Sequence, residues 1–111
     1  MKTSQELFIE LTESESVEVV SGKFVFEDGE AMMDRDFVNK RFVNCELRGG
    51  DFASGSFRNC AFEKVLFKNL ALVGVSFTSC SFIDCKLSNI QIDFDMSNCM
   101  INHLTITYEE F

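Results

Sequence analysis

Cysteine and histidine are the side chains best suited to nucleophilic or metal chemistry, and this chain of 111 residues has five of the first and one of the second. The cysteines are Cys45, Cys60, Cys80, Cys85 and Cys99. Thiol-redox sites and structural zinc sites typically use closely spaced pairs such as CxxC, and the sequence contains no such pair. An odd number of unpaired cysteines favours small buried apolar residues in a reducing compartment.

The histidine and the paired acidic residues offer no clearer chemistry. His103 falls at an expected turn, and the sequence pattern places no partner beside it. Asp93 and Asp95 flank another turn, and Glu109 and Glu110 come close to the last residue, so both pairs are interpreted as solvated charge. The sequence has neither a Gly-rich phosphate loop that opens a helix nor a nucleophile elbow. We therefore predict a protein that is not an enzyme and has no catalytic, cofactor-binding or metal site.

The composition is that of one globular domain. Apolar residues make up 46% of the chain and charged residues 25%, which excludes a disordered chain. Thirteen Phe stand against one Tyr and no Trp, which favours a dry interior because Phe carries no polar group. We find no apolar stretch typical of a signal peptide or a membrane span, so we expect a cytoplasmic protein with no membrane contact.

The net charge of −8 is unevenly distributed along the chain. Residues 1–36 hold 3 basic and 10 acidic side chains, which gives −7. Residues 37–111 hold 7 basic and 8 acidic side chains, which gives −1. The acidity therefore belongs to the N-terminal segment, and the rest of the chain is nearly neutral.

A five-residue repeat dominates the sequence from residue 37 onward and must position every candidate residue. The central positions are Phe37, Phe42, Leu47, Phe52, Phe57, Phe62, Phe67, Leu72, Phe77, Phe82, Leu87 and Ile92. Two residues before most of these centres stands a small or apolar residue, and two residues after them stands a turn residue such as Asn, Gly or Ser, with Lys64 as the exception. Neither the 3.6-residue period of a helix nor the alternation of a strand fits this pattern, which predicts a solenoid.

Pentapeptides such as "CELRG", "GDFAS", "GSFRN" and "CKLSN" resemble the pentapeptide-repeat family, whose motif is A(D/N)LXX with Leu or Phe at the centre. The resemblance covers residues 36–111. It implies an all-β fold, a right-handed four-sided β-helix with four pentapeptides in each coil, so that residues twenty apart stack in ladders. Residues 32–111 would then form about four coils. Stacked Cys60, Cys80 and Cys99 suggest a metal column, but burial among Phe rings leaves an ion no route and favours apolar packing.

The repeat changes phase once, and the segment before it differs in character. Met96, not Ser97, holds the apolar side chain expected next, so we predict a tightened corner where one residue is missing near 93–95. Residues 1–31 are interpreted as an acidic N-terminal cap within the same single domain.

The cap itself shows alternating apolar and polar residues in "ELFIEL" and "SVEVV", which indicates extended chain. From about residue 17 the pattern predicts a degenerate first coil, with the side chains of Val19, Phe24 and Phe26 pointing inward and a one-residue insertion near 31–32.

Two surfaces are candidates for binding another protein. At the C-terminal end, the exposed side of the last coil would present Leu104, Ile106, Tyr108 and Phe111. Pairing with a second copy would cover this end, so we expect a homodimer. On one flat side of the β-helix, the candidate partner face consists of Val43, Ala61, Ile83 and Met100.

We interpret the chain as a non-catalytic protein-interaction or structural module built on a rigid β-helix. The resemblance also implies an alternative, because some family members are acidic dimeric rods that mimic DNA, bind type II topoisomerases such as gyrase and confer resistance to quinolones or toxins. The nearly neutral repeat region and the outward cations Arg48, Arg58 and Lys68 depart from such a mimic. We expect a protein partner and no direct binding of nucleic acid.

Overall fold

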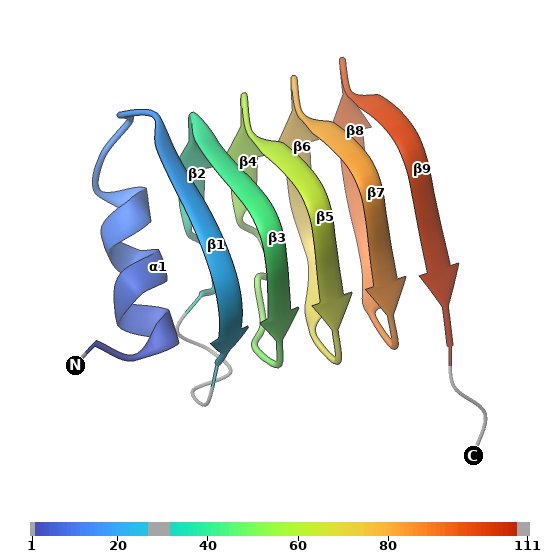
Figure 1. Cartoon of the computed structure of the whole chain (residues 1–111), viewed down its shortest axis with the longest axis horizontal. Helices are drawn as coiled ribbons and strands as arrows, with labels where there is room; N and C mark the ends of the chain where they lie inside the picture. The colour runs from blue at the N-terminus through green and yellow to red at the C-terminus, as the bar shows by residue number, and fades with distance from the viewer. Residues whose placement is uncertain (1, 27–31, 109–111) are drawn as a thin grey trace.

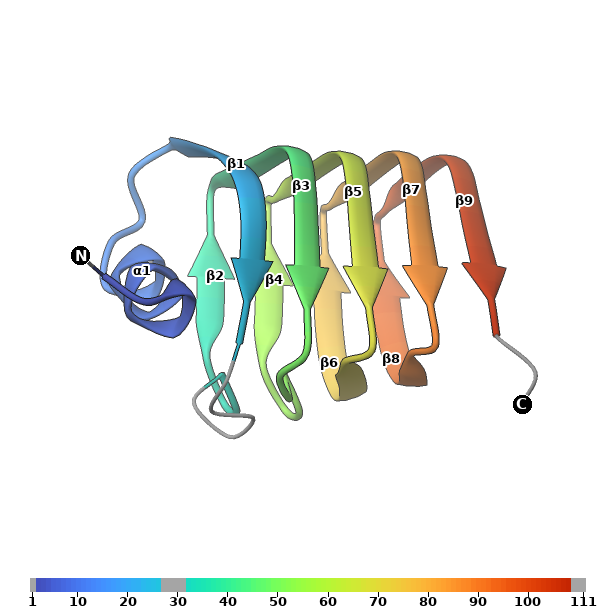
Figure 2. The same ribbon diagram turned by 60° about the horizontal axis from the view of Figure 1, so that its bottom comes forward.

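Two parallel β-sheets, built from alternate strands of one winding chain, make up the protein (Figures 1 and 2). The computed structural model describes residues 2–26 and 32–108. The described residues form one helix, α1 (Ser4–Thr12), and nine strands, β1 (Glu18–Val25), β2 (Asp36–Val38), β3 (Lys40–Arg48), β4 (Ser56–Arg58), β5 (Ala61–Lys68), β6 (Ala71–Thr78), β7 (Ser81–Ser88), β8 (Gln91–Ser97) and β9 (Met100–Thr107). One sheet has the order β1-β3-β5-β7-β9 and the other β2-β4-β6-β8.

The register of the strands makes this winding a β-helix of about four turns, and the expected all-β solenoid is confirmed. Phe57 lies opposite Phe37 on one side and Phe77 on the other, twenty residues away in each direction. Since twenty residues complete one coil and inward residues recur every five, each coil has four sides. A five-residue unit cannot bury its own apolar side chain, so the chain must wind and stack to form a core.

The core is a set of parallel ladders of inward side chains. Of the twelve central positions, the eleven from Phe37 to Leu87 are buried and Ile92 is half-buried. In one ladder the rings of Phe42 and Phe62 stack with centroids 5.1 Å apart, and those of Phe62 and Phe82 stack at 4.9 Å. Each buried Phe contributes about 1.5–3 kcal/mol from apolar surface removed from water, so these ladders carry most of the stabilising burial.

The corners between the sides use left-handed backbone. The eleven residues two positions after the centres from Phe37 to Leu87 all have φ between 52° and 73°; they are Asn39, Asn44, Gly49, Ser54, Asn59, Lys64, Asn69, Gly74, Ser79, Asp84 and Asn89. Asn, Asp and Gly tolerate this region better than other residues, which explains their recurrence. Lys64 adopts the same conformation with φ 54°, so the corner geometry comes from the coil and overrides the preference of the residue.

Replacing Lys64 with Asn should stabilise the protein. The substitution relieves an unfavourable left-handed backbone conformation without touching the core, and we expect a gain of about 0.5–1 kcal/mol in the free energy of unfolding. Chemical denaturation followed by circular dichroism measures the change. The matched control is Lys68→Asn, which places Asn at an outward strand position where it should lower stability. Equal effects from the two substitutions would contradict the prediction.

The phase change of the repeat lies where the sequence predicts it. Val73 pairs with Asp93 and Val75 pairs with Phe94, so Gly74 has no counterpart in β8. The next coil therefore lacks the corner residue and proceeds directly from one side to the next. Phe77 then lies opposite Met96, nineteen residues later, which confirms the dropped residue.

The N-terminal segment differs from expectation in two respects. "ELFIEL" is part of α1, not an extended segment, because Thr3 caps the helix by accepting a hydrogen bond from the Glu6 backbone N–H at 3.2 Å. The degenerate first coil exists as β1, but Val19 is exposed, and Val20 is the residue that lies opposite Phe42. The prediction for Val19 was therefore wrong by one position. The predicted insertion near 31–32 falls partly outside the described residues.

Phe8 shows what the helix contributes to the core. It is fully buried, and its ring lies 5.0 Å from Phe24, 4.9 Å from Phe26 and 5.8 Å from Phe42, measured between centroids. The side chain therefore enters the interior of the first coil from its open end. This covers apolar surface that a bare first coil would expose to water.

Candidate interaction surfaces

Lys40 is the most unusual polar residue of the structure. It occupies an inward position two residues before Phe42, and its side chain is 0% exposed. Its Nζ donates hydrogen bonds to the Ser14 carbonyl at 2.9 Å, the Ser16 carbonyl at 2.6 Å and Glu18 Oε1 at 2.9 Å. These three acceptors supply what a buried ammonium needs, and they hold the linker between α1 and β1 against the coil.

Lys40 was missed by the sequence reasoning, although a signal was present. It stands five residues before Cys45, in the phase of the small inward column, where a lysine is out of place. A charged residue at an inward position predicts a partner outside the repeat. The partner residues lie 22–26 positions earlier in the chain, and no repeat pattern points to them.

The inward cysteines act as small hydrogen-bond donors within the core. Each thiol donates to a carbonyl of the preceding coil, at distances from 3.1 to 3.5 Å: Cys45 to Val20, Cys60 to Phe37, Cys80 to Phe57, Cys85 to Phe62 and Cys99 to Phe77. All five are free thiols, and only Cys99 is not fully buried. Burial raises the pKa of the Cys45 and Cys85 thiols, and the interaction with the neighbouring Cys60 sulfur together with burial raises the pKa of Cys80. These groups are therefore protonated at neutral pH.

The remaining candidates for chemistry lie apart from one another. His103 is exposed at a corner with φ 68°, and its Nδ1 lies 3.5 Å from Asp84 Oδ1, so the fold supplies one carboxylate that the sequence did not indicate. Within residues 2–26 and 32–108, no group of three His, Cys, Asp or Glu side chains is placed to hold a metal ion. No helix in this part of the chain is long and apolar enough to cross a membrane.

The C-terminal coil exposes positions that the three coils before it bury. Phe82 is 2% exposed, whereas Ile101, its partner in the next strand, is 51% exposed. Leu87 is likewise 2% exposed and its partner Ile106 is 46% exposed. Among the described residues, no strand pairs with the outer edges of β8 and β9.

The four residues expected to be exposed at the C-terminal end differ in how far the structure buries them. Leu104 is half-buried against the core, whereas Ile106 and Tyr108 are exposed. Phe111 lies outside the described residues. Ile101 and Met100 add exposed apolar surface that the sequence reasoning did not assign to this end.

The expected partner face lies on one side of β3, β5, β7 and β9, but it is not continuous. Val43 and Ile83 belong to one ladder, and Glu63 stands between them. Ala61 and Met100 belong to the neighbouring ladder, and only Met100 is exposed. The carboxylate divides this apolar surface, whereas Met100, Ile101, Ile106 and Tyr108 are all exposed at the C-terminal end.

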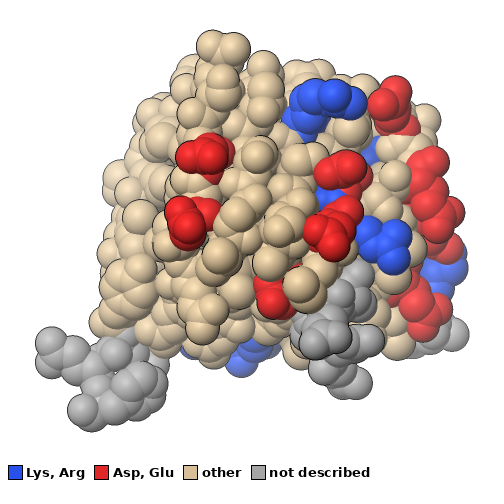
Figure 3. Space-filling view, turned by 180° about the vertical axis from the view of Figure 1, so that it is seen from behind, with Lys and Arg blue, Asp and Glu red and all other residues tan. Residues whose placement is uncertain are grey.

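Charge is distributed by side rather than evenly. On the outward side of β1, β3 and β5, Glu46 Oε2 lies 3.4 Å from Lys23 Nζ and 3.5 Å from Arg48 Nη2. Lys68 lies opposite Arg48 in the next strand. Figure 3 shows the opposite side, where acidic side chains gather along the end formed by α1 and are sparse over the central strands. The protein is therefore acidic at its N-terminal end and locally basic on one flat side.

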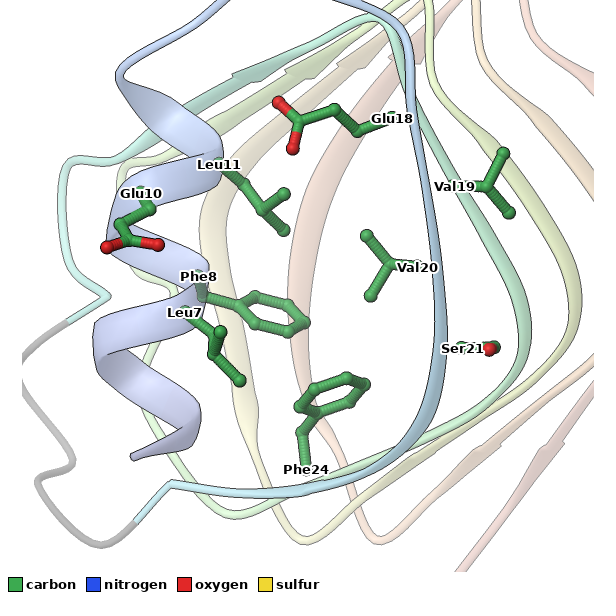
Figure 4. Close-up of a pocket in the computed structure, with 9 residues that line it drawn as sticks. All are labelled: Leu7, Phe8, Glu10, Leu11, Glu18, Val19, Val20, Ser21 and Phe24. Atoms are coloured by element: carbon green, nitrogen blue, oxygen red, sulfur yellow. The ribbon is translucent and has the colours of Figure 1, made fainter. Parts of the chain in front are cut away.

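A cleft separates part of α1 from β1 (Figure 4). Its volume is about 350 Å³, and it is lined from the helix by Leu7, Phe8, Glu10 and Leu11 and from the strand by Glu18, Val19, Val20, Ser21 and Phe24. Figure 4 shows Phe8 and Leu11 pointing from the helix toward β1, and Val20 and Phe24 pointing back toward the helix. The floor of the cleft is thus apolar. Glu18 points from β1 toward the helix, whereas the Glu10 carboxylate lies on the side of α1 turned away from β1.

Comparison with known proteins adds no family to this description. No protein-family model matches the chain, and no curated protein matches it either.

Proposed function

We propose that this protein is a non-catalytic interaction module of the pentapeptide-repeat kind, which associates with a second copy of itself through its C-terminal coil. The observation that carries the proposal is the change in exposure from Leu87 to Ile106 in consecutive coils. A rigid, fully packed β-helix offers flat surfaces and strand edges, which suits binding to proteins. The five free thiols support a cytoplasmic location.

The membership of the pentapeptide-repeat family is part of this proposal. It is supported by the coil of twenty residues and by left-handed backbone at every fifth residue from Asn39 to Asn89. It is also supported by aromatic or aliphatic residues at each centre, since stacked five-residue sides demand one inward side chain apiece.

A second copy fits the C-terminal end better than another protein would. An isologous contact about a twofold axis brings identical coils face to face, so the inward side chains of one coil meet side chains of matching arrangement. The N-terminal end cannot substitute, because α1 covers it with the buried ring of Phe8. Association is therefore expected to stop at a dimer and not to extend into a filament.

Light scattering on the purified chain tests the dimer. We expect the wild type to be dimeric and Ile106→Glu to be monomeric, with a dissociation constant raised about 30-fold or more, because the substitution places a charge at the centre of an apolar contact. The matched control is Val73→Glu, which alters an apolar residue of similar exposure on β6 and should leave the dimer intact. A monomeric wild type would refute self-association.

The charge distribution favours this proposal over DNA mimicry. A mimic of duplex DNA needs regularly spaced acidic side chains along the rod, whereas strands β1, β3, β5 and β7 carry Lys23, Arg48, Lys68 and Lys86 on their outward side. Most of the negative charge comes from the first 36 residues, which hold 10 acidic side chains. The cations along the described strands therefore support an interaction module over a mimic of DNA.

A further inference from the structure

Helix α1 is attached to the first coil at both of its ends. At its start, Ser4 Oγ accepts a hydrogen bond from the backbone N–H of Val25, at the end of β1, at 3.1 Å. At its far end, the carbonyls of Ser14 and Ser16 are held by Lys40 beside the beginning of β1. The helix therefore runs antiparallel to β1, fastened at both ends, and the cleft opens between these two attachments.

The strand wall of the cleft is an unpaired sheet edge. β1 is the first strand of its sheet and pairs only with β3, so in the described part of the chain its outer edge meets no strand. Successive peptide groups of a parallel strand point alternately to its two sides, so half of those in β1 face the helix. The bond from Val25 N–H to Ser4 Oγ shows that these groups are directed toward α1 and are able to bond there.

The side chains of the cleft define what could lie along that edge. Leu7, Val20 and Phe24 offer accessible apolar surface in the cleft. Val19 points away from the cleft in Figure 4, so the strand offers mainly its main chain at that point. An apolar floor beside open peptide groups fits an extended chain with apolar residues at alternate positions.

The electrostatics of the cleft select the other positions of such a chain. Glu10 and Glu18 line it, paired with Lys2 and Lys40 respectively. The five glutamates of residues 2–18 and the three cations that pair with them, Lys2, Lys40 and Arg58, give 3 positive and 5 negative charges, a sum of −2. A cationic ligand is therefore favoured and an anionic one is repelled.

We propose that the cleft between α1 and β1 binds an extended segment of a partner protein, with alternating apolar and basic residues, as an added strand on the edge of β1. Its apolar residues pack on Leu7, Val20 and Phe24, and its lysines or arginines lie near Glu10 and Glu18. The site deepens the proposed interaction function by naming a partner class. It lies at the opposite end of the β-helix from the dimer contact, so either can fail without the other.

A labelled peptide of about ten residues, alternating valine and lysine, is the probe. Fluorescence anisotropy measures its affinity for the whole chain, and hydrogen exchange measures protection of the β1 amides. We expect binding with new protection in β1. A peptide that alternates valine and glutamate, and a valine–lysine peptide methylated at alternate backbone nitrogens, should both bind about tenfold more weakly. Equal binding of either control would overturn the proposal, the first by removing charge selection and the second by removing strand addition.

Two variants place the peptide in the cleft. Leu7 lies on the cleft wall and is 39% exposed. The substitution Leu7→Trp narrows the opening and should weaken peptide binding about tenfold. The matched control, Val73→Trp on β6, should leave peptide binding unchanged. Glu10→Gln should weaken binding about threefold, whereas Glu13→Gln makes the same change of charge outside the cleft and should have a smaller effect.

The variants also separate this site from self-association. Light scattering should show the same oligomeric state for Leu7→Trp as for the wild type. Undetectable binding of the valine–lysine peptide, or binding that Leu7→Trp leaves unchanged, would overturn the peptide site and leave the dimer proposal standing.

Discussion

Lys40→Met should lower the free energy of unfolding by about 2–4 kcal/mol at neutral pH. The ammonium of Lys40 is fully buried and donates to two carbonyls and one carboxylate. Methionine fills similar space but donates nothing, so the Ser14 and Ser16 carbonyls lose their charged partner. The Glu18 side chain is 43% exposed, so its carboxylate can form hydrogen bonds with water in the variant. The loss of stability is therefore smaller than for a fully buried ion pair.

Urea denaturation measures the loss, and hydrogen exchange shows where it acts. Exchange should accelerate first in α1 and in the linker between Glu13 and Val17, because Lys40 fastens that linker to the coil. The matched control is Lys86→Met, which alters an exposed lysine on β7 and should change stability by no more than about 0.5 kcal/mol. If Lys40→Met cost no more than the control, the buried ammonium would contribute nothing net to the fold.

Phe57→Ala should be the most destabilising single substitution in the core, with a loss of about 3–5 kcal/mol. The ring of Phe57 stacks between Phe37 at 4.7 Å and Phe77 at 5.2 Å, and it is 2% exposed. Strands above and below it are held by backbone hydrogen bonds, so the coils cannot close around the cavity. Its removal also breaks a continuous ladder in both directions.

A graded series keeps this prediction testable if the alanine variant does not fold. Phe57→Leu should cost about 1–2 kcal/mol, because it leaves a smaller cavity. Phe94→Ala, in the half-buried last coil, should cost clearly less than Phe57→Ala, since that side chain has no coil beyond it. Guanidinium denaturation of the three variants gives the order. A larger loss for Phe94→Ala would show that the centre of the rod is not its most tightly packed part.

The β-helix was predictable because its signal is local and repeated. Each side needs an inward residue at its centre and a left-handed residue at its corner, so one requirement is written many times between Phe37 and Asn89. Even the missing residue opposite Gly74 was visible, since it shifts every later centre by one. Repetition averages out single exceptions such as Lys64.

The N-terminal cap was only partly predictable, because its interactions occur once. The capping residues Thr3 and Glu6 mark the start of a helix, but the alternation in "ELFIEL" obscured this signal. The inward residue of β1 was misplaced by one because the first coil is one residue short opposite β3. A single coil has no second copy from which its phase can be read.

The sequence by itself determined the period, the corners and the identity of the core, because each of these requirements recurs every five residues. The four sides and the twenty-residue coil were implied by the family resemblance, and the register of the strands shows them. Only the tertiary structure decided how the ends are treated. It showed that Lys40 is buried under a linker 24–26 residues earlier, that Phe8 enters the first coil, and that the last coil exposes Ile101 and Ile106. These features depend on single long-range contacts between unlike segments. Such a contact occurs once, so it leaves no repeated pattern in the sequence from which it could be predicted.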